Sequence, residues 1–420
     1  MTAPPADTDG RTDLDRPVAL HALVFLDEGE DVTVGRPDTD SYCVLPADGA
    51  ALLRELERGC SPRQAADWYA QAYGEPVDVA EFLAAMDELG FTRGPQGAEA
   101  GGISSLADVG TGVRQPRWQR LGVWTFSRSA WFCYAVLLLV WVAAMARHPD
   151  LLPRTHHLLF TRYATVIMGL GVFGQLPFVL LHESFHALAG RRLGLQSRLR
   201  ISRRLYFLVI ETTLDGLVVV PRRQRYLPIL AGMFADLLTM AVLTLAAAGL
   251  RHPDGSQPLA GQLCLALAFL TLLRFVWQFY FFLQTDLYQL VVTVLGCVDL
   301  QTTASRLIAN RVNRLLGRRH RLHDESRWHP RDRAVARWYC WLLIAGYLAL
   351  LGSFLLAALP VLRRLFGDAA NRLVRGQQVS WSSIADSATF LLLTVAQLII
   401  VSFIVLRERR QRRTSVHVIH

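Results

Sequence analysis

The chain has 420 residues, of which 52% are hydrophobic and only 19% are charged. Soluble domains carry about 25% charged residues, so this composition excludes an ordinary soluble enzyme as well as collagen-like and disordered chains. The formal charge of the whole chain is +9, yet residues 1–100 contain 7 Arg and 20 Asp or Glu. An acidic N-terminal part therefore precedes a basic, strongly apolar body. The six cysteines are scattered without a CxxC pair, so neither a disulfide framework nor a thiolate zinc cluster is expected.

The N-terminal part is predicted to form a small α+β domain over residues 17–93, after a disordered acidic segment at 1–16. Short runs rich in β-branched and aromatic residues, bounded by turn residues, predict three strands. They are expected at residues 18–26, 31–34 and 41–45. The strands should be followed by helices that cover one face of a small sheet.

Three short helices are predicted after these strands. Asp48 can cap the first helix, and Asp78 starts the third. Ser61 and Gln64 form a capping box for the second helix, with a proline at its first helical position. Residues 94–129 begin with a stretch rich in Gly, Ala and Ser, and we interpret them as a linker and juxtamembrane segment.

Six long apolar stretches follow and predict transmembrane helices. They cover residues 130–146, 164–181, 227–250, 259–298, 338–362 and 388–406. A helix that crosses a bilayer needs about 20 apolar residues, and so many runs in one chain favour a membrane domain over a buried globular core. We therefore expect a mainly α, polytopic helical membrane protein with about six transmembrane helices over residues 130–406. The stretch at 259–298 should cross once, as a broken or tilted helix.

Arginine-rich segments indicate how the predicted spans are oriented. They lie at residues 191–204, 222–225, 306–337 and 407–413. The positive-inside rule places such segments in the cytoplasm, and six spans with both termini cytoplasmic satisfy all of them. The expected location is the cell membrane, with a basic cytoplasmic tail at 407–420. Nucleic acid is not expected as a partner, because arginines beside apolar spans are better explained by attraction to anionic lipid headgroups.

An HExxH motif lies at the end of the second predicted span and comprises His182, Glu183 and His186. Residues i and i+4 share one face of a helix, so both imidazoles can reach one metal ion. Glu183 can hold a water and take its proton, since bound Zn²⁺ lowers the pKa of that water to about 7. We expect Zn²⁺ as the cofactor and Glu183 as the catalytic base. The alternative is a set of interfacial polar residues that form hydrogen bonds with neighbouring helices.

A catalytic zinc site usually has three protein ligands, so a further carboxylate is needed. Asp286 lies inside the fourth apolar stretch, where acidic residues are rare and usually functional. Asp215 lies in a strand-like segment between basic loops, where a carboxylate needs no partner, and Glu211 is a weaker candidate. The predicted ligands are His182, His186 and Asp286, with Asp215 as the alternative third ligand.

The segment LHESFHALAGRRLG resembles the active-site helix of the site-2 protease family of intramembrane zinc metalloproteases. His182, Glu183 and His186 match the two ligands and the general base of that family. Arg191 and Gly194 match the tail of its motif. The resemblance implies a membrane-embedded peptidase that hydrolyses a peptide bond with one zinc ion.

Two further segments are similar to motifs of the same family. LAGMFADLLTMAV is similar to its AGPxxN helix, with Met233 and Asp236 in place of Pro and Asn. YFFLQTDLYQL is similar to its NPxxxxDGY segment, and Asp286 and Tyr288 match it. The departures in this segment are Tyr280, Phe281 and Leu287 in place of Asn, Pro and Gly. The resemblance implies that Asp286 is the third ligand.

The N-terminal domain resembles the PqqD-type winged-helix domain, over SYCVLPADGAALLRELERGCSPRQAADWYAQAYGEPVDVAEFLAAMDELGFTR and the strands before it. The resemblance implies recognition of leader segments of ribosomally synthesised, post-translationally modified peptides by strand addition. The open edge of the sheet would then lie at residues 32–34 or 41–45. The alternative is a generic winged-helix domain with another partner.

These features together predict an intramembrane zinc metalloprotease that removes the leader of a modified-peptide precursor. Its expected partners are a peptide or membrane-protein substrate, the lipid bilayer, and peptide-modifying or export proteins. One alternative is a non-proteolytic membrane protein that acts as a peptide carrier, export partner or immunity factor. Another is a membrane oxygenase or desaturase, which needs more clustered histidines than the HExxH pair supplies.

Overall fold

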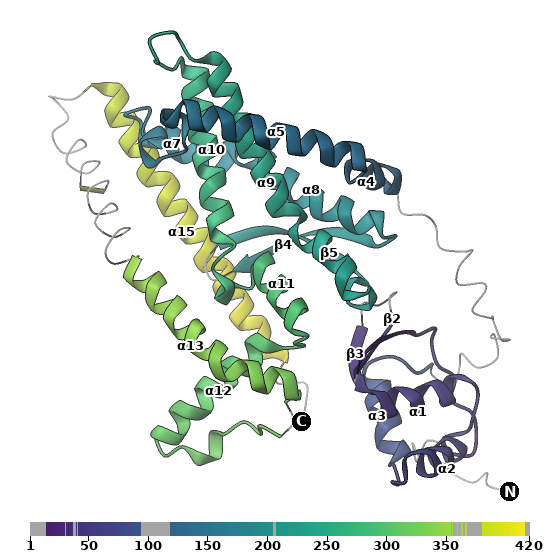
Figure 1. Cartoon of the computed structure of the whole chain (residues 1–420). Helices are drawn as coiled ribbons and strands as arrows, with labels where there is room; N and C mark the ends of the chain where they lie inside the picture. Colours follow the sequence, from purple (N-terminus) through teal and green to yellow (C-terminus); the bar gives the residue numbers. More distant parts are fainter. Residues whose placement is uncertain are drawn as a thin grey trace, which may run out of the picture. The chain divides into compact units, whose positions relative to one another are not determined.

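The computed structural model describes residues 14–93, 118–353 and 380–415, with gaps at 30, 37, 38, 40, 205, 206 and 327, and a few residues between 354 and 379. The chain divides into two compact units (Figure 1). One comprises residues 1–117 with 194–196 and 214–225, and the other comprises 118–193, 197–213 and 226–420. The predicted segments at 1–16, 94–129 and 407–420 lie partly outside the described residues.

The N-terminal unit contains an antiparallel sheet in the order β1, β2, β3. Its strands are β1 (Val24–Glu28), β2 (Asp31–Arg36) and β3 (Ser41–Pro46). The second and third predicted strands are confirmed, whereas the first begins only at Val24, and the preceding Leu20 forms an isolated bridge with Thr92. Because β2 pairs on both sides, the expectation of an open edge at residues 32–34 is wrong. Within the described residues β3 is an edge strand.

Three helices pack on this sheet: α1 (Ala47–Glu57), α2 (Pro62–Tyr73) and α3 (Val79–Glu88). The capping box is confirmed, since the Ser61 hydroxyl accepts from the Gln64 amide and the Gln64 side chain accepts from the Ser61 amide. Asp78 caps α3 as predicted. Asp48 does not cap α1: it lies inside the first turn and accepts a hydrogen bond from Tyr69, which raises the pKa of that phenol to about 12. The core includes Val34, Leu53, Leu83 and Phe91.

The second unit is predominantly helical (Figure 1). Its helices are α4 (Gln119–Thr125), α5 (Arg128–Arg147), α6 (Thr155–Leu158), α7 (Ala164–Gly169), α8 (Leu176–Arg192), α9 (Arg222–Leu250), α10 (Leu259–Trp277), α11 (Asp286–Leu295), α12 (Leu300–Leu315), α13 (Pro330–Ser353) and α15 (Trp381–Ser415). A hairpin of β4 (Gln196–Arg204) and β5 (Phe207–Asp215) follows α8 along the chain. A π-helical turn (Leu170–Gly174) connects α7 to α8.

Among the described residues, five helices are long and apolar enough to cross a membrane, or up to six if α11 and α12, which are bent by 88°, form one span. The predicted mainly helical fold with a small N-terminal sheet is thus confirmed. The stretch at 259–298 is broken as expected, because α10 ends at Trp277 and α11 begins at Asp286. The stretch at 388–406 lies inside α15, and the end of 338–362 extends beyond α13 into residues that are mostly not described.

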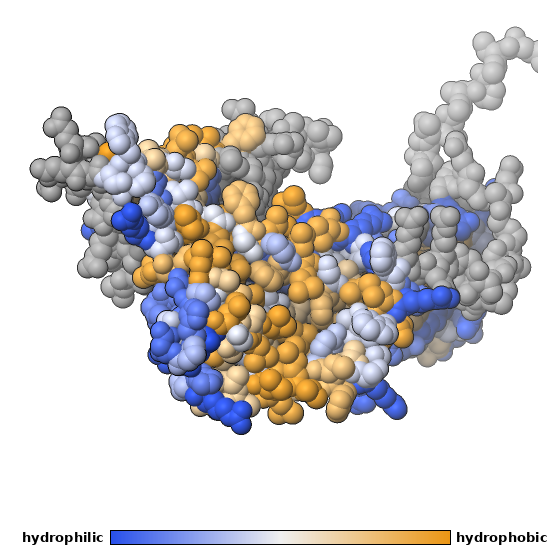
Figure 2. Space-filling view, turned by 90° about the horizontal axis from the view of Figure 1, so that it is seen from above, coloured by the Kyte–Doolittle hydropathy of each residue, from blue (hydrophilic) through white to orange (hydrophobic). Residues whose placement is uncertain are grey.

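Apolar side chains on the helical unit are exposed over a broad area (Figure 2). On α5, Phe132 and Leu139 are each 70% exposed, which water would disfavour and lipid would not. The helix α9 is buried instead of exposed, since its residues Ala231, Ala241 and Ala247 are fully buried. Such small residues let neighbouring helices approach closely in a membrane. The helix α9 is therefore central, and it is the helix against which the HExxH motif packs.

Candidate metal centre

The HExxH motif lies on α8, as the sequence predicts. The rings of His182 and His186 are one helical turn apart, with their centroids separated by 4.9 Å. Both histidines and Glu183 are buried, with exposed fractions of 5%, 8% and 7%. Three polar side chains of an apolar helix therefore point into the protein, which is where functional polar groups lie in the helices of membrane proteins.

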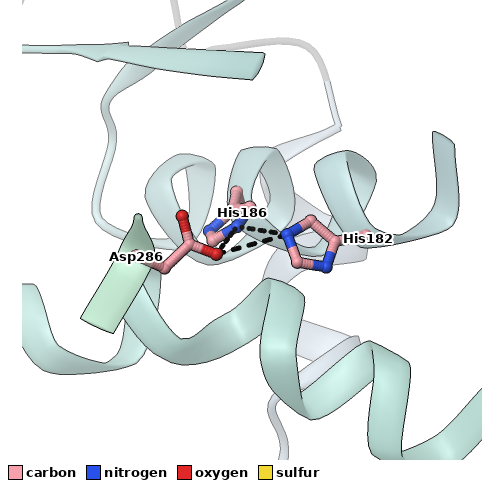
Figure 3. A group of neighbouring side chains, drawn as sticks. All are labelled: His182, His186 and Asp286. Carbon is pink, nitrogen blue, oxygen red and sulfur yellow. Dashed lines mark hydrogen bonds and ion pairs between the residues drawn. The ribbon is translucent and has the colours of Figure 1, made fainter. Parts of the chain in front are cut away.

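Asp286, the first residue of α11, completes this group (Figure 3). Its Oδ2 atom lies 3.2 Å from Nε2 of His182 and 3.2 Å from Nε2 of His186. The two Nε2 atoms are also 3.2 Å apart. Ligands at about 2.0–2.1 Å from a tetrahedral Zn²⁺ are separated by about 3.3 Å, so the triangle has the size of one face of a zinc tetrahedron. This spacing fits a metal ion with one position left for another ligand.

Hydrogen bonds to the far side of each imidazole set its tautomer. Nδ1 of His186 lies 2.7 Å from the carbonyl oxygen of Pro228 on α9. A carbonyl can only accept, so this nitrogen carries a proton, and in the neutral imidazole Nε2 then keeps its lone pair. Nδ1 of His182 lies 3.0 Å from the carboxylate of Asp236, also on α9, with the same consequence. Both lone pairs thus face Asp286, as histidine ligands of metals usually require.

A glycine allows α9 to lie very close to both imidazoles. An added Cβ at Gly232 would overlap Nε2 of both His182 and His186. Every other residue type has a Cβ, which here would displace the donor atoms of the two histidines. The close packing of α9 against the histidines thus depends on one missing side chain.

The charges around the triangle favour a divalent cation. Glu183 lies 4.0 Å from Nε2 of His182, and Asp236 pairs with Arg274 of α10 at 2.6 Å. When both imidazoles are neutral, as metal ligands must be, the three carboxylates, including that of Asp286, and one guanidinium leave a net charge of −2 in a buried site. Unbalanced charge in a low-dielectric interior is costly, and one Zn²⁺ would cancel it.

Asp286 is held in place by the turn that precedes α11. The Thr285 hydroxyl donates to the carbonyl of Gln278 at 2.6 Å, and the side-chain oxygen of Gln278 accepts from the Asp286 amide at 3.1 Å. Between them, Gln284 adopts a left-handed conformation with φ of 56°. The neighbouring Phe282 is buried in a cluster with residues of α12 and α13. The turn is therefore anchored at both ends, and Asp286 is directed at the histidines.

The sequence predictions for the site can be compared with these positions. Among the described residues, the group that could hold a metal contains Asp286, His182 and His186, and neither Asp215 nor Glu211 belongs to it. The histidines at 156, 157, 320, 323 and 329 do not join it either. Sequence reasoning noted Asp236 only as a departure from a motif. It missed Gly232, Arg274 and Gln278, although an arginine inside an apolar stretch is itself a signal.

The backbone of the motif is joined to the β-hairpin by a hydrogen bond. The Thr212 hydroxyl of β5 donates to the carbonyl oxygen of Glu183 at 3.0 Å. The Glu183 carboxylate lies beside the donor triangle without belonging to it. The carboxylate lies 4.0 Å from Nε2 of His182, close enough to interact with a ligand bound at the triangle.

Comparisons of the chain with protein-family models, with curated proteins and with solved structures found no match. The site must therefore be interpreted from its own chemistry. The described residues include five or six helices able to cross a membrane, and a buried group of two histidines and one aspartate spaced for a metal ion.

Proposed function

We propose that this chain is an intramembrane zinc metallopeptidase. The observation that carries the proposal is the triangle of His182, His186 and Asp286, with 3.2 Å edges, beside the buried carboxylate of Glu183. Three ligands with an open position and a nearby carboxylate are typical of catalytic rather than structural zinc. The helices that supply these residues are among the apolar ones, or adjoin them.

The residues have distinct roles in the proposed reaction. His182, His186 and Asp286 would hold Zn²⁺, which when bound supplies a Lewis acid for the scissile carbonyl and lowers the pKa of water. Glu183 accepts a proton from the attacking water and returns it to the leaving amine. Burial keeps this carboxylate away from bulk water, which strengthens its interactions with the reacting groups.

We further propose that the N-terminal unit recognises the peptide substrate. Its three-stranded sheet followed by three helices has the element order expected of a winged-helix leader-binding domain. The strand β3 lies at an edge of the sheet, which is where a peptide is bound by strand addition. The substrate would be the precursor of a ribosomally synthesised, modified peptide, whose leader is removed at the membrane. A membrane-spanning regulator is the other substrate class.

The test is a comparison of point variants purified in detergent. Glu183→Gln should keep one zinc per chain, because the ligands are unchanged, and should lower cleavage of labelled unfolded casein at least about 100-fold. His186→Ala and Asp286→Ala should lose zinc and activity together. Zinc is measured by elemental analysis.

A matched control is Glu211→Gln, which removes a carboxylate of β5 outside the metal-binding group. It should keep both zinc and activity. Full activity in Glu183→Gln would overturn the proposed mechanism. Zinc binding in the wild-type chain without cleavage of any peptide would favour a peptide carrier or export partner instead.

A further inference from the structure

Arg274 places a guanidinium inside the apolar helix α10, three residues before the end of that helix. Its Nη2 and Nε atoms donate to Oδ1 of Asp236 at 2.6 and 3.2 Å. Its Nη1 atom donates to the side-chain oxygen of Gln175 at 2.7 Å. The side chain of Arg274 is 17% exposed and that of Asp236 is fully buried. The guanidinium is thus clamped between a carboxylate on α9 and an amide just before α8.

Gln175 is itself fixed in position. It follows the π-helical turn Leu170–Gly174, and its side-chain amide donates to the carbonyl of Leu267 on α10 at 3.1 Å. π-Helical turns shift the register of the residues after them and frequently occur at functional sites. Here the shifted register brings a glutamine toward Arg274, so that the guanidinium cannot turn away from Asp236 without losing a second charge-assisted hydrogen bond.

Asp236 connects Arg274 to the proposed metal site, because its carboxylate contacts both Arg274 and His182. Its Oδ2 atom lies 3.0 Å from Nδ1 of His182, while Oδ1 is held by Arg274. The carboxylate is therefore held from two directions, and the imidazole that binds to it has one orientation. Without the guanidinium, this fully buried carboxylate would keep only the His182 imidazole as a side-chain partner among the described residues.

We propose that Arg274 is a positioning residue for the metal site, acting through Asp236 on His182. It holds the carboxylate against Nδ1, which directs Nε2 at the ion, and it cancels the charge of Asp236. The two carboxylates that remain at the site, Glu183 and Asp286, then match the charge of one divalent cation. This inference rests on the proposed metal site but not on peptidase activity.

The competing explanation is that the Arg274–Asp236 pair only joins α9 to α10. The two explanations predict different metal affinities for a double variant. Asp236→Asn with Arg274→Gln removes both charges and keeps an oxygen at position 236 that can accept from Nδ1 of His182. A positioning role predicts that this double variant recovers the metal affinity that Arg274→Gln alone loses. A joining role predicts that it does not.

The experiment uses the full chain in detergent, stripped of metal and titrated with Co²⁺. The readouts are the visible absorption spectrum of the bound ion and its dissociation constant from competition with a chelator. Arg274→Gln should weaken binding about 10- to 100-fold, the usual effect of removing a partner behind a ligand, and should alter the spectrum. The double variant should return to within a few-fold of wild type.

Arg251→Gln is the matched control, because Arg251 forms another arginine–aspartate pair, with Asp150 at 3.2 Å. It should leave Co²⁺ affinity unchanged. If Arg274→Gln does not fold, Arg274→Lys and the double variant carry the comparison, with the lysine variant expected to bind more weakly than the double variant.

Three outcomes separate the claims. Wild-type affinity in Arg274→Gln overturns the positioning role and leaves the proposed function standing. Equal losses in Arg274→Gln and in the double variant overturn it as well, in favour of a joining role. Failure of the wild-type chain to bind Co²⁺ or Zn²⁺ overturns the metal site itself, and the inference with it.

Discussion

At Gly232, one missing side chain decides whether α9 can lie against the two histidines of the motif. The helix brings this residue so close to α8 that a Cβ would overlap the Nε2 atoms of His182 and His186. Gly249, near the other end of the same helix, has open space where its Cβ would be. The two glycines belong to one helix and differ only in what faces them, which makes them a controlled pair.

Gly232→Ala should abolish zinc binding, because the added methyl would overlap the Nε2 atoms of both histidines and displace them. Alanine favours a helix by about 1 kcal/mol over glycine, so the loss cannot come from a weakened α9. Gly249→Ala gains the same helix propensity and should keep full zinc content. Elemental analysis of both purified variants checks this. Stoichiometric zinc in Gly232→Ala would mean that the two histidines do not hold the ion in the arrangement seen in this structure.

At the scale of elements, the span that carries the motif is fastened at its start by a distant helix. The carboxylate of Asp386, on α15, accepts from the backbone amides of Ala164 and Thr165 at 3.0 and 2.9 Å. The Thr165 hydroxyl donates back to the Asp386 carbonyl at 2.9 Å. Tyr163, at the N-cap of α7, makes no side-chain cap itself, so the cap comes from a residue 222 positions away.

Asp386→Ala should destabilise the start of α7 by about 1 kcal/mol, the usual cost of losing a cap, and more if α15 detaches. We expect a lower midpoint of thermal unfolding in detergent, with zinc content preserved because the ligands lie more than two turns away. Asp386→Asn keeps one acceptor oxygen and should lose less. Equal midpoints for the alanine variant and the wild type would show that this cap contributes nothing to stability.

At the scale of the whole molecule, the apolar helices and the arginine-rich segments together predict which loops lie on which side of the membrane. The loop between α9 and α10 contains few arginines, whereas the segment from α12 to the start of α13 contains many. The positive-inside rule assigns the first to the outside and the second to the cytoplasm. Ser256 and Ser326 mark these two loops, and each donates to an aspartate two residues earlier in a similar turn.

In a variant whose six native cysteines are replaced, Ser256→Cys should react with a membrane-impermeant maleimide in intact cells. Ser326→Cys should react only after the cells are permeabilised. Both serines are exposed and occupy matched turns, so a difference in labelling reports sidedness rather than local structure. Labelling of both positions in intact cells would contradict cytoplasmic termini with six spans.

Much of this protein follows from patterns that are local in the chain. The capping box at Ser61 and the helical pairing of His182 with His186 depend on residues three or four positions apart, so their geometry is set by one helical turn. The apolar stretches likewise mark most of the long helices, because lipid requires about 20 consecutive apolar residues for each crossing. Asp286 could be preferred to Asp215 for the same reason, since a carboxylate inside an apolar stretch needs a partner.

Other features depend on where separate helices meet, and no local pattern contains that information. The strand predicted at 18–26 was misplaced, and the sequence could not decide whether residues 32–34 or 41–45 form the edge of the sheet. Both features depend on which strands pair with each other. The roles of three features come from contacts between separate segments of the chain. These features are Gly232, Gln278 and the Arg274–Asp236 pair. The sequence by itself determined which side chains could bind a metal. Only the tertiary structure decided that three of them converge at 3.2 Å, because that distance is set by the packing of α8, α9 and α11.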